Sequence, residues 1–504
     1  MKVPAAMWLI AIPLFVVPVV YLVGHMSRAR AADFKGPAAA RWVALTALVA
    51  AAFPFAQAAH ELALYGPTTF AVGLIYLRAD GLTLLMAGII YVLAIAAALF
   101  AGPDMAGDAG EEKFYALLLI LAGTAVGLVS AGDLFNLWLW FETMTISSYL
   151  LVAFYRDRPA TLEASIKYLV QSGAGSILVL LGVALVLAQT GTLDLEQIPS
   201  AATDSPGLLA AGALFLIGFG VKAALVPLHT WLPDAHSQAP SAVSALLSGV
   251  VIEAGLVALL RALAALAGVS LSWGLFLMGF GALNLLVGNL MALRQQQVKR
   301  LLAYSSLTHI GYMLLGLGIA IYAGQLAGAQ GGFFHLVNHG LMKGLAFLTA
   351  GALIFALRLG AGYGEHRPLT IADLSGVARR YPVAALTLSI ALLGLGGLPP
   401  LAGFMSEWQI FTAGFITRNA AIEGLVVFAA LMSVMSMAYY VPLVNAMYRQ
   451  EASEAVKAGT SIPGVVLLPL VLLALAVVAI GLWPGLLEWL TAPAGAALLT
   501  AFGG

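Results

Sequence analysis

The chain has 504 residues, of which 62% are hydrophobic and 9% are charged, with a formal net charge of zero. Soluble proteins usually carry about 25% charged residues, so this composition excludes an ordinary water-exposed surface and indicates a membrane protein. Cysteine is absent, which excludes disulfides, thiolate-bound zinc and cysteine-ligated iron–sulfur clusters. The zero net charge gives no indication of nucleic-acid binding.

Apolar segments long enough to cross a hydrocarbon core of about 30 Å as helices recur along the whole chain. We expect about fourteen of them, at 4–24, 42–62, 70–100, 114–130, 133–154, 164–189, 207–229, 240–264, 271–293, 301–322, 331–357, 382–413, 421–447 and 463–490. The alternating polarity of β-barrel strands is absent from the segment 462–487. The sequence therefore predicts an all-α polytopic membrane protein, with the first apolar segment as its first helix rather than a signal peptide.

Basic residues are distributed unevenly between the expected loops. If the amino terminus is outside, four of them lie on the outer side: Lys2, Arg78, Arg261 and Arg418. The inner side then carries Arg28, Arg30, Lys35, Arg41, Lys113, Arg156, Arg158, Arg294, Lys299, Arg300, Arg358, Arg367, Arg379, Arg380, Arg449 and Lys457. The positive-inside rule therefore predicts that both termini face the periplasm of a bacterial cytoplasmic membrane.

Ionisable residues also occur inside the expected spans: Glu142, Lys167, Lys222, Glu253, Lys343 and Glu407. A charged side chain at the centre of a bilayer costs about 2.5–3.5 kcal/mol on insertion scales, so each of these residues needs a compensating reason. They could pair with one another and only hold helices together. Their number favours a second interpretation, in which they form a pathway for ions.

Two of these residues stand beside predicted helix breaks. Lys222 precedes Pro227 in GFGVKAALVPLHTWLPDAH, and Glu407 follows Pro399 and Pro400 in GLGGLPPLAGFMSEW. Proline lacks a backbone donor and its ring clashes with the preceding turn, so we expect breaks in the seventh and twelfth spans. Interrupted spans in two halves are typical of inverted repeats around a midplane site; ordinary proline kinks are the alternative. The segments would be 1–112 (helices 1–3), 113–265 (helices 4–8, first repeat), 266–450 (helices 9–13, second repeat) and 451–504 (last helix).

The eleventh span reads FFHLVNHGLMKGLAFL and places His335, His339 and Lys343 at i, i+4 and i+8 on one helical face. The ladder would be about 12 Å long. Histidine changes charge between about pH 5 and 8, so the ladder suits proton relay. A zinc site is disfavoured because the third rung is lysine and no thiolate exists. His229 and His309 could extend the ladder.

Long motifs in five spans resemble a known family. They are LWLWFETM, KAALVPLHTWLPDAHSQAPSAVSALLSG, VKRLLAYSSLTHIGYMLLGLG, FFHLVNHGLMKGLAFL and GLPPLAGFMSEW. Through them nearly the whole chain resembles the antiporter-like membrane subunits shared by respiratory complex I, Mrp-type sodium/proton antiporters and membrane-bound hydrogenases.

The resemblance implies roles for the buried charges. Glu142 and Lys222 would form the glutamate–lysine couple of a first half-channel, Glu407 would end a second one, and the ladder of the eleventh span would belong to a central hydrophilic axis. Glu253 departs from the pattern, because many relatives have lysine or histidine there. If Glu253 is structural, its expected partner is Lys167 or Arg261.

Three functions are open at this point. The first is an ion-translocating subunit of a larger complex, whose redox partner carries iron–sulfur clusters and whose other membrane subunits include related antiporter-like chains. The second is a subunit of an Mrp-type antiporter without redox chemistry, and the third is a structural subunit with an inactive channel. In each case the chain itself needs no cofactor and no metal, and the ion is a proton or Na⁺.

Overall fold

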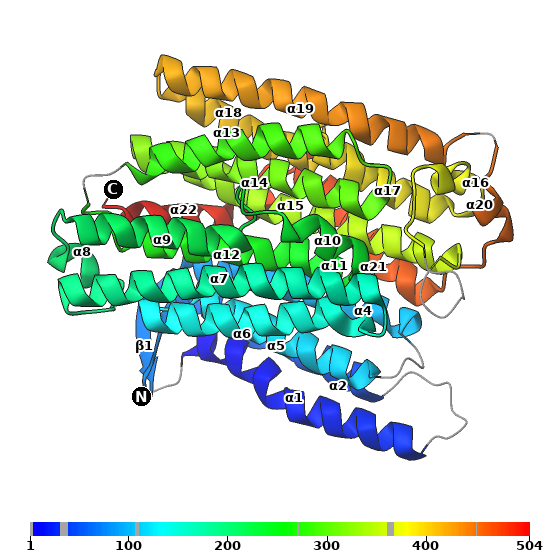
Figure 1. Ribbon diagram of the computed structural model, residues 1–504, viewed down its shortest axis with the longest axis horizontal. Coiled ribbons are helices and arrows are strands. Elements are labelled where there is room, and N and C mark those ends of the chain that lie inside the picture. Colours follow the sequence, from blue (N-terminus) through cyan, green and yellow to red (C-terminus); the bar gives the residue numbers. More distant parts are fainter. Residues whose placement is uncertain are drawn as a thin grey trace.

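The computed structural model describes residues 4–30, 39–105, 110–269, 272–359, 367–449 and 451–503. Within these ranges, twelve helices are long and apolar enough to cross a membrane, and two shorter apolar helices accompany them. Most of the helices run side by side along the long axis of the molecule (Figure 1). The predicted polytopic, helical membrane class is therefore confirmed. Lys2 and Lys35, which were assigned to opposite sides, lie outside the described residues.

The amino-terminal part contains a β-hairpin that the sequence did not predict. Its elements are α1 (Ala5–Arg30), α2 (Ala39–Ala50), α3 (Ala52–Tyr65), β1 (Thr68–Val72), β2 (Ile75–Ala79) and α4 (Gly81–Asp104). The expected span 70–100 is wrong at its start, because β1 and β2 pair antiparallel with Thr68 opposite Ala79. The helix begins only after Asp80, whose side chain accepts a hydrogen bond from the Thr83 backbone at 2.9 Å. The fold is thus helical with one small sheet.

The next part contains the first predicted break. Its elements are α5 (Glu111–Val129), α6 (Leu134–Val152), η1 (Ala153–Tyr155), α7 (Pro159–Thr190), α8 (Ile198–Ala201), α9 (Pro206–Lys222), α10 (Trp231–Gln238), α11 (Ser241–Leu246), the π-helical turn η2 (Leu247–Val251) and α12 (Ile252–Ala264). The α9 helix ends at Lys222, as expected. Asn284 satisfies the freed backbone, because its Oδ1 accepts from Val226 N at 2.8 Å and its Nδ2 donates to Ala224 O at 3.1 Å.

The second predicted break is also present. The elements here are α13 (Trp273–Ala292), α14 (Val298–Ala323), α15 (Leu326–Ala356), η3 (Ala372–Leu374), α16 (Val377–Arg380), α17 (Pro382–Leu395), α18 (Ala402–Ile416) and α19 (Ala420–Met447). Residues 396–401 separate α17 from α18. Asn338 Nδ2 donates to Ala402 O at 2.9 Å, so a buried amide again supports the interrupted backbone.

The last crossing is broken as well, which corrects the expected single span 463–490. The elements are α20 (Glu454–Ala458), α21 (Gly464–Leu482), η4 (Pro484–Leu487) and α22 (Glu488–Ala501). Gly481, near the end of α21, lies against the backbone of Pro400 and Leu401 in the α17–α18 break. Gly495 of α22 lies against Leu326, the first residue of α15. The two helices α21 and α22 therefore share one crossing, interrupted by Pro484.

Both ends of the chain lie at the same end of the helix bundle, which also carries the β1–β2 hairpin (Figure 1). We call this the hairpin end and the other the opposite end. The elements α16, α17 and α20 appear toward the opposite end. The chain thus returns to the side on which it starts. The assignment of this side to the periplasm stays a prediction.

Candidate functional site

The predicted ladder on α15 forms a fully buried row. His335, His339 and Lys343 all have zero exposure, and almost the whole helix is enclosed. The crossing from Ser241 to Ala264 beside it is buried throughout. The polar row therefore lies in the interior of the bundle and not on a lipid-facing surface, which is where ionisable groups in a membrane are tolerated.

Three histidines from two helices stand in contact. His309 Nδ1 of α14 lies 3.0 Å from His335 Nε2 of α15, and His335 Nδ1 lies 2.9 Å from Ser406 Oγ of α18. The rings of His309 and His339 are 5.3 Å apart between centroids. An imidazole can accept a proton at one nitrogen and release another at the second, so this chain of rings can pass a proton from helix to helix.

Glu253 pairs with a histidine of the row. Its Oε1 lies 2.7 Å from His339 Nδ1, and both side chains are completely buried. Among the described residues, Glu253 Oε2 and His339 Nε2 have no hydrogen-bond partner. The two groups can share one proton, and each retains a free atom that can exchange a further proton or bind water.

The partners expected for Glu253 were wrong. Arg261 Nη2 instead bonds Asp80 Oδ1 at 2.9 Å. Lys167 is exposed and pairs with Glu163 at 2.8 Å and Asp234 at 3.1 Å. Because α7 has 32 residues, about 48 Å of helix, its first turns extend beyond a hydrocarbon core of about 30 Å. Lys167 lies about 12 Å from the start of α7, near the edge of that core, and is outside the buried row.

Lys222 occupies an aromatic enclosure at the end of α9. Its Nζ donates to Tyr168 OH at 2.9 Å and to Ser172 Oγ at 3.2 Å. The same atom lies 4.4 Å from the centroid of the Tyr168 ring, which stacks on Trp231 with centroids 4.0 Å apart. Aromatic faces and two hydroxyls thus stabilise a buried ammonium without a bound carboxylate. Sequence reasoning missed Tyr168 and Ser172, although they recur four residues apart on α7.

Glu142 of α6 is half-buried, and within the described ranges its Oε2 atom has no hydrogen-bond partner. No salt bridge joins Glu142 to Lys222 among the described residues, so the expected glutamate–lysine couple is not a direct ion pair in this structure.

Lys343 and Glu407 extend the row in two directions. Lys343 Nζ donates to Leu302 O at 2.8 Å and also to Ser305 Oγ. Glu407 is buried and accepts from Ser433 Oγ at 2.7 Å, while its other oxygen has no hydrogen-bond partner in the part of the chain that the structure describes. The histidine chain reaches Ser406, the residue beside Glu407, so the contacts run from α15 into the broken crossing α17–α18.

The structure separates the two histidines of the PLHTWLPDAH motif. His229, a predicted site residue, is half-buried and lies 6.5 Å from the ring of Tyr304, without a bond to the histidine row. His236, which sequence reasoning missed, is fully buried and stacks on Phe347 of α15 at 4.6 Å. Within the described ranges, neither ring nitrogen of His236 has a hydrogen-bond partner, and Nδ1 of His229 has none either. His236 is therefore a further candidate for proton exchange, because it is buried against the helix that carries the histidine row.

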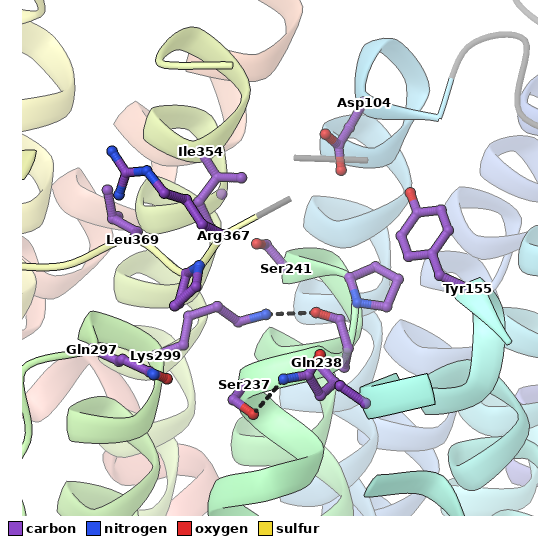
Figure 2. A pocket seen from close by; sticks show the side chains of 15 residues that line it. Asp104, Tyr155, Ser237, Gln238, Ser241, Gln297, Lys299, Ile354, Arg367 and Leu369 are labelled. Carbon is purple, nitrogen blue, oxygen red and sulfur yellow. Dashed lines mark hydrogen bonds between the residues drawn. The ribbon is translucent and has the colours of Figure 1, made fainter. Parts of the chain in front are cut away.

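A cavity of about 290 Å³ approaches His236 from the opposite end. Its lining includes Asp104, Arg367 and Lys299, and Ser237 follows His236 directly. Figure 2 shows the Lys299 side chain reaching the segment after α10, where its Nζ donates to Ala239 O at 2.5 Å. Sequence reasoning counted Lys299 as a loop charge, yet it is buried. The cavity thus contacts Lys299 and the residue that follows His236.

Metal-binding side chains do not cluster among the described residues. Within the described ranges, no group of three or more His, Cys, Asp or Glu side chains could hold a metal ion. The contacts instead join hydroxyls, imidazoles, lysines and carboxylates, which are groups that exchange protons.

Comparisons with known proteins identify the family of the chain. Residues 131–436 match the family described as NADH:quinone oxidoreductase/Mrp antiporter, TM. NADH-quinone oxidoreductase subunit N 1 of Sorangium cellulosum is 36% identical over 427 residues, 81% of each chain. F(420)H(2) dehydrogenase subunit N of Methanosarcina mazei is 33% identical over 377 residues, 74% of this chain and 75% of that one.

A solved chain of the membrane-bound sulfane sulfur reductase, an archaeal respiratory membrane complex, superposes with a TM-score of 0.86 at 29% identity, covering 99% of this chain and 98% of that one. The family match includes all the candidate residues from Glu142 to Glu407. This chain therefore belongs to the NADH:quinone oxidoreductase/Mrp antiporter transmembrane family.

Proposed function

We propose that the chain translocates protons across a membrane as one subunit of a larger complex, driven by redox chemistry in partner subunits. The similar proteins named above are subunits of an NADH-quinone oxidoreductase, an F(420)H(2) dehydrogenase and a respiratory membrane complex. The observation that carries the proposal is the buried contact chain of Glu253, His339, His309 and His335, because it crosses the interior between three helices.

The proposed path starts in the cavity at the opposite end. A proton passes from water to Lys299 and His236, and then to Lys343 on α15. It continues along the buried histidines, with Glu253 as a proton-sharing partner of His339. Each imidazole accepts at one nitrogen and releases at the other, so the tautomers must reset before the next proton arrives. Glu407 receives the proton after His335 and Ser406.

Lys222 and Glu142 provide the proposed coupling element. A nearby carboxylate favours the charged form of a lysine, and burial favours the neutral form. A change in the distance between Glu142 and Lys222 therefore changes how strongly the lysine holds its proton. The missing direct salt bridge supports this role, because a locked pair could not respond to a partner subunit.

The orientation and the internal repeats belong to the same proposal. We place the hairpin end outside, at the periplasmic face of a bacterial cytoplasmic membrane, because the predicted basic loops cluster at the opposite end. Residues 113–265 and 266–450 form the two inverted repeats, each with one broken crossing. The cavity beside Lys299 then opens to the cytoplasm.

Substitution of Lys222 tests the function. We expect Lys222→Ala to abolish proton uptake by vesicles that contain the whole complex, while the complex still assembles, because no other cation stands in the aromatic enclosure. Lys167→Ala is the matched control: it removes an exposed lysine on the helix that also carries Tyr168, and uptake should not change. Uptake at the wild-type rate in Lys222→Ala would refute the proposed role.

Two further measurements separate the alternatives. Copurified iron–sulfur subunits support a redox complex, whereas an Mrp-type assembly brings none. Proton uptake that survives a sodium ionophore and disappears with a protonophore identifies the proton as the transported ion. Uptake that depends on Na⁺ would favour sodium/proton exchange instead.

A further inference from the structure

The third broken crossing borders a polar cavity that the pathway described above does not use. The cavity has a volume of about 410 Å³ and lies between α15, α18 and the η4–α22 segment. Polar side chains supply more than half of its lining residues: Gln330, Gln409, Thr412, Glu488 and Thr491. Ala327, in the first turn of α15, marks its mouth near the hairpin end, and Phe334 lines its deeper part.

Glu488 lies deep relative to the hairpin end. Gly495 of α22 is level with Leu326 and Ala329 at the start of α15. Glu488 precedes Gly495 by seven residues, so it lies about 10 Å further into the bundle. With 31 residues, α15 is about 46 Å long and exceeds a hydrocarbon core of about 30 Å by about 8 Å at each end. The carboxylate is therefore at the depth of the hydrocarbon.

The polar side chains of this cavity have few partners within the protein. Glu488, Gln330 and Gln409 are all at least partly exposed, and none of their side-chain atoms forms a hydrogen bond with another residue in the described ranges. Lipid chains cannot satisfy an amide or a carboxylate at this depth. Water entering from the hairpin end can do so, because the cavity starts at the first turn of α15.

The deep part of the cavity adjoins the proposed proton pathway. Phe334 is buried and directly precedes His335, whose ring belongs to the histidine chain. Gln409 follows Glu407 by two residues on α18. Phe334 and the buried Ile410, which packs against Gly331 of α15, therefore separate the cavity from the buried row.

We propose that this cavity is a water-filled vestibule that connects the buried row to the hairpin end, and that Glu488 is the protonatable group within it. The inference rests on the proposed proton translocation and assigns its exit. Glu488 accepts the proton after Glu407, the last group of the proposed pathway, and releases it to water at the mouth near Ala327. Among the residues that line the vestibule, Glu488 is the one ionisable side chain.

The absence of cysteine from this chain allows a direct test of hydration, because an introduced thiol is the one thiol of the chain, and labelling is read on this chain after it is separated from its partner subunits. Gln330→Cys and Thr412→Cys are made in the whole complex, and a membrane-impermeant methanethiosulfonate is added on the side of the hairpin end. Val427→Cys is the control, since Val427 is half-exposed on α19 about 10 Å from its start. We expect both vestibule thiols to react at least about tenfold faster than the control thiol. Equal rates would overturn the vestibule.

A second experiment tests Glu488 itself. Glu488→Gln should slow proton release several-fold, and Glu488→Asp should restore most of the rate. Glu454→Gln removes a highly exposed carboxylate on α20 and should have no effect. Wild-type release by Glu488→Gln would remove Glu488 from the inference. If the wild-type complex translocates protons but the thiols stay unreactive, only the vestibule fails; if the thiols react and the wild-type complex translocates no protons, the proposed function fails instead.

Discussion

The buried ion pair of Asp80 and Arg261 allows a quantitative prediction about the joint between the hairpin and the helix bundle. Arg261 Nη2 contacts both carboxylate oxygens of Asp80, at 2.9 and 3.1 Å, and Arg261 Nε donates to Val129 O at 2.8 Å. Both side chains are almost completely buried. Asp80 also caps α4 through Thr83. One carboxylate therefore holds the start of α4 and neutralises a buried cation of α12.

We expect Asp80→Ala to destabilise the chain by about 4–6 kcal/mol. Removing one partner of a buried ion pair costs about 3–5 kcal/mol, and losing a helix cap costs about 1 kcal/mol more. Asp80→Asn keeps the cap and should cost only the about 3–5 kcal/mol that the broken ion pair contributes. In an Arg261→Leu background, Asp80→Ala should cost less than in the wild type, because the buried Arg261 is gone and Arg78, which also pairs with Asp80, keeps Glu196 as a partner.

The assay is equilibrium denaturant unfolding of the purified chain in micelles, analysed as a double-mutant cycle. Lys457→Ala is the control, because Lys457 forms an exposed ion pair that should not affect stability measurably. A coupling energy near zero between Asp80 and Arg261 would refute the reasoning, as would equal destabilisation by Asp80→Asn in the presence and absence of Arg261.

The same pair gives a pH dependence. Asp80 precedes the membrane-spanning α4; burial alone would raise the pKa of its carboxyl, but Arg261 and Arg78 hold that pKa below its usual range. A lowered folded-state pKa contributes stability that is present above the unfolded value of about 3.9. This contribution to the stability falls as the pH drops below about 4 toward the lower pKa that Asp80 has in the folded protein. Asp80→Asn should flatten this part of the unfolding profile; an unchanged profile would contradict the assignment.

Three other substitutions test the site. Glu253→Lys places a cation against the buried His339 and should reduce both complex yield and proton uptake, with Glu253→Gln milder; uptake above wild type would contradict the proton-sharing pair. Tyr168→Phe removes the hydroxyl on Lys222 but keeps the ring stack, so uptake should fall about tenfold with assembly intact, given about 1.5 kcal/mol for a hydrogen bond to a charged group. Lys299→Met should slow uptake from the opposite end several-fold in a stopped-flow pH assay; an unchanged rate would exclude that entrance.

The membrane class and the two predicted breaks could be obtained from the sequence because they depend on local chemistry. Hydropathy alone identifies most crossings, and prolines beside Lys222 and Glu407 predict where α9 and α17 end. The hairpin at 68–79 escaped because its residues are mostly apolar, β-branched or aromatic and merge with the following helix in hydropathy. Residues 488–501 escaped because the crossing they complete is interrupted by Pro484.

The residues of the site could be predicted more easily than the contacts between them. His335, His339 and Lys343 share a face by helical periodicity within one element, so the ladder could be derived. Glu253 could not be assigned to His339, because the two residues are 86 positions apart. The π-helical turn η2 also ends just before Glu253, and one extra residue in a turn rotates the following helix face by about 100°. Counting with a period of 3.6 from Ser241 therefore gives the wrong face.

The ionisable residues at the broken crossings agree with the electrostatics of helix ends inside a membrane. Lys222 is the last residue of α9, where the helix dipole is negative, and Glu488 is the first residue of α22, where it is positive. Each charge thus matches the unsatisfied backbone groups beside it. Glu253 lies in a continuous crossing without such an end, and it has a buried histidine as its partner instead. A chain of this kind can therefore hold charges in a membrane in two ways, at interrupted helices or in side-chain pairs, and only the second requires a partner that can itself exchange protons.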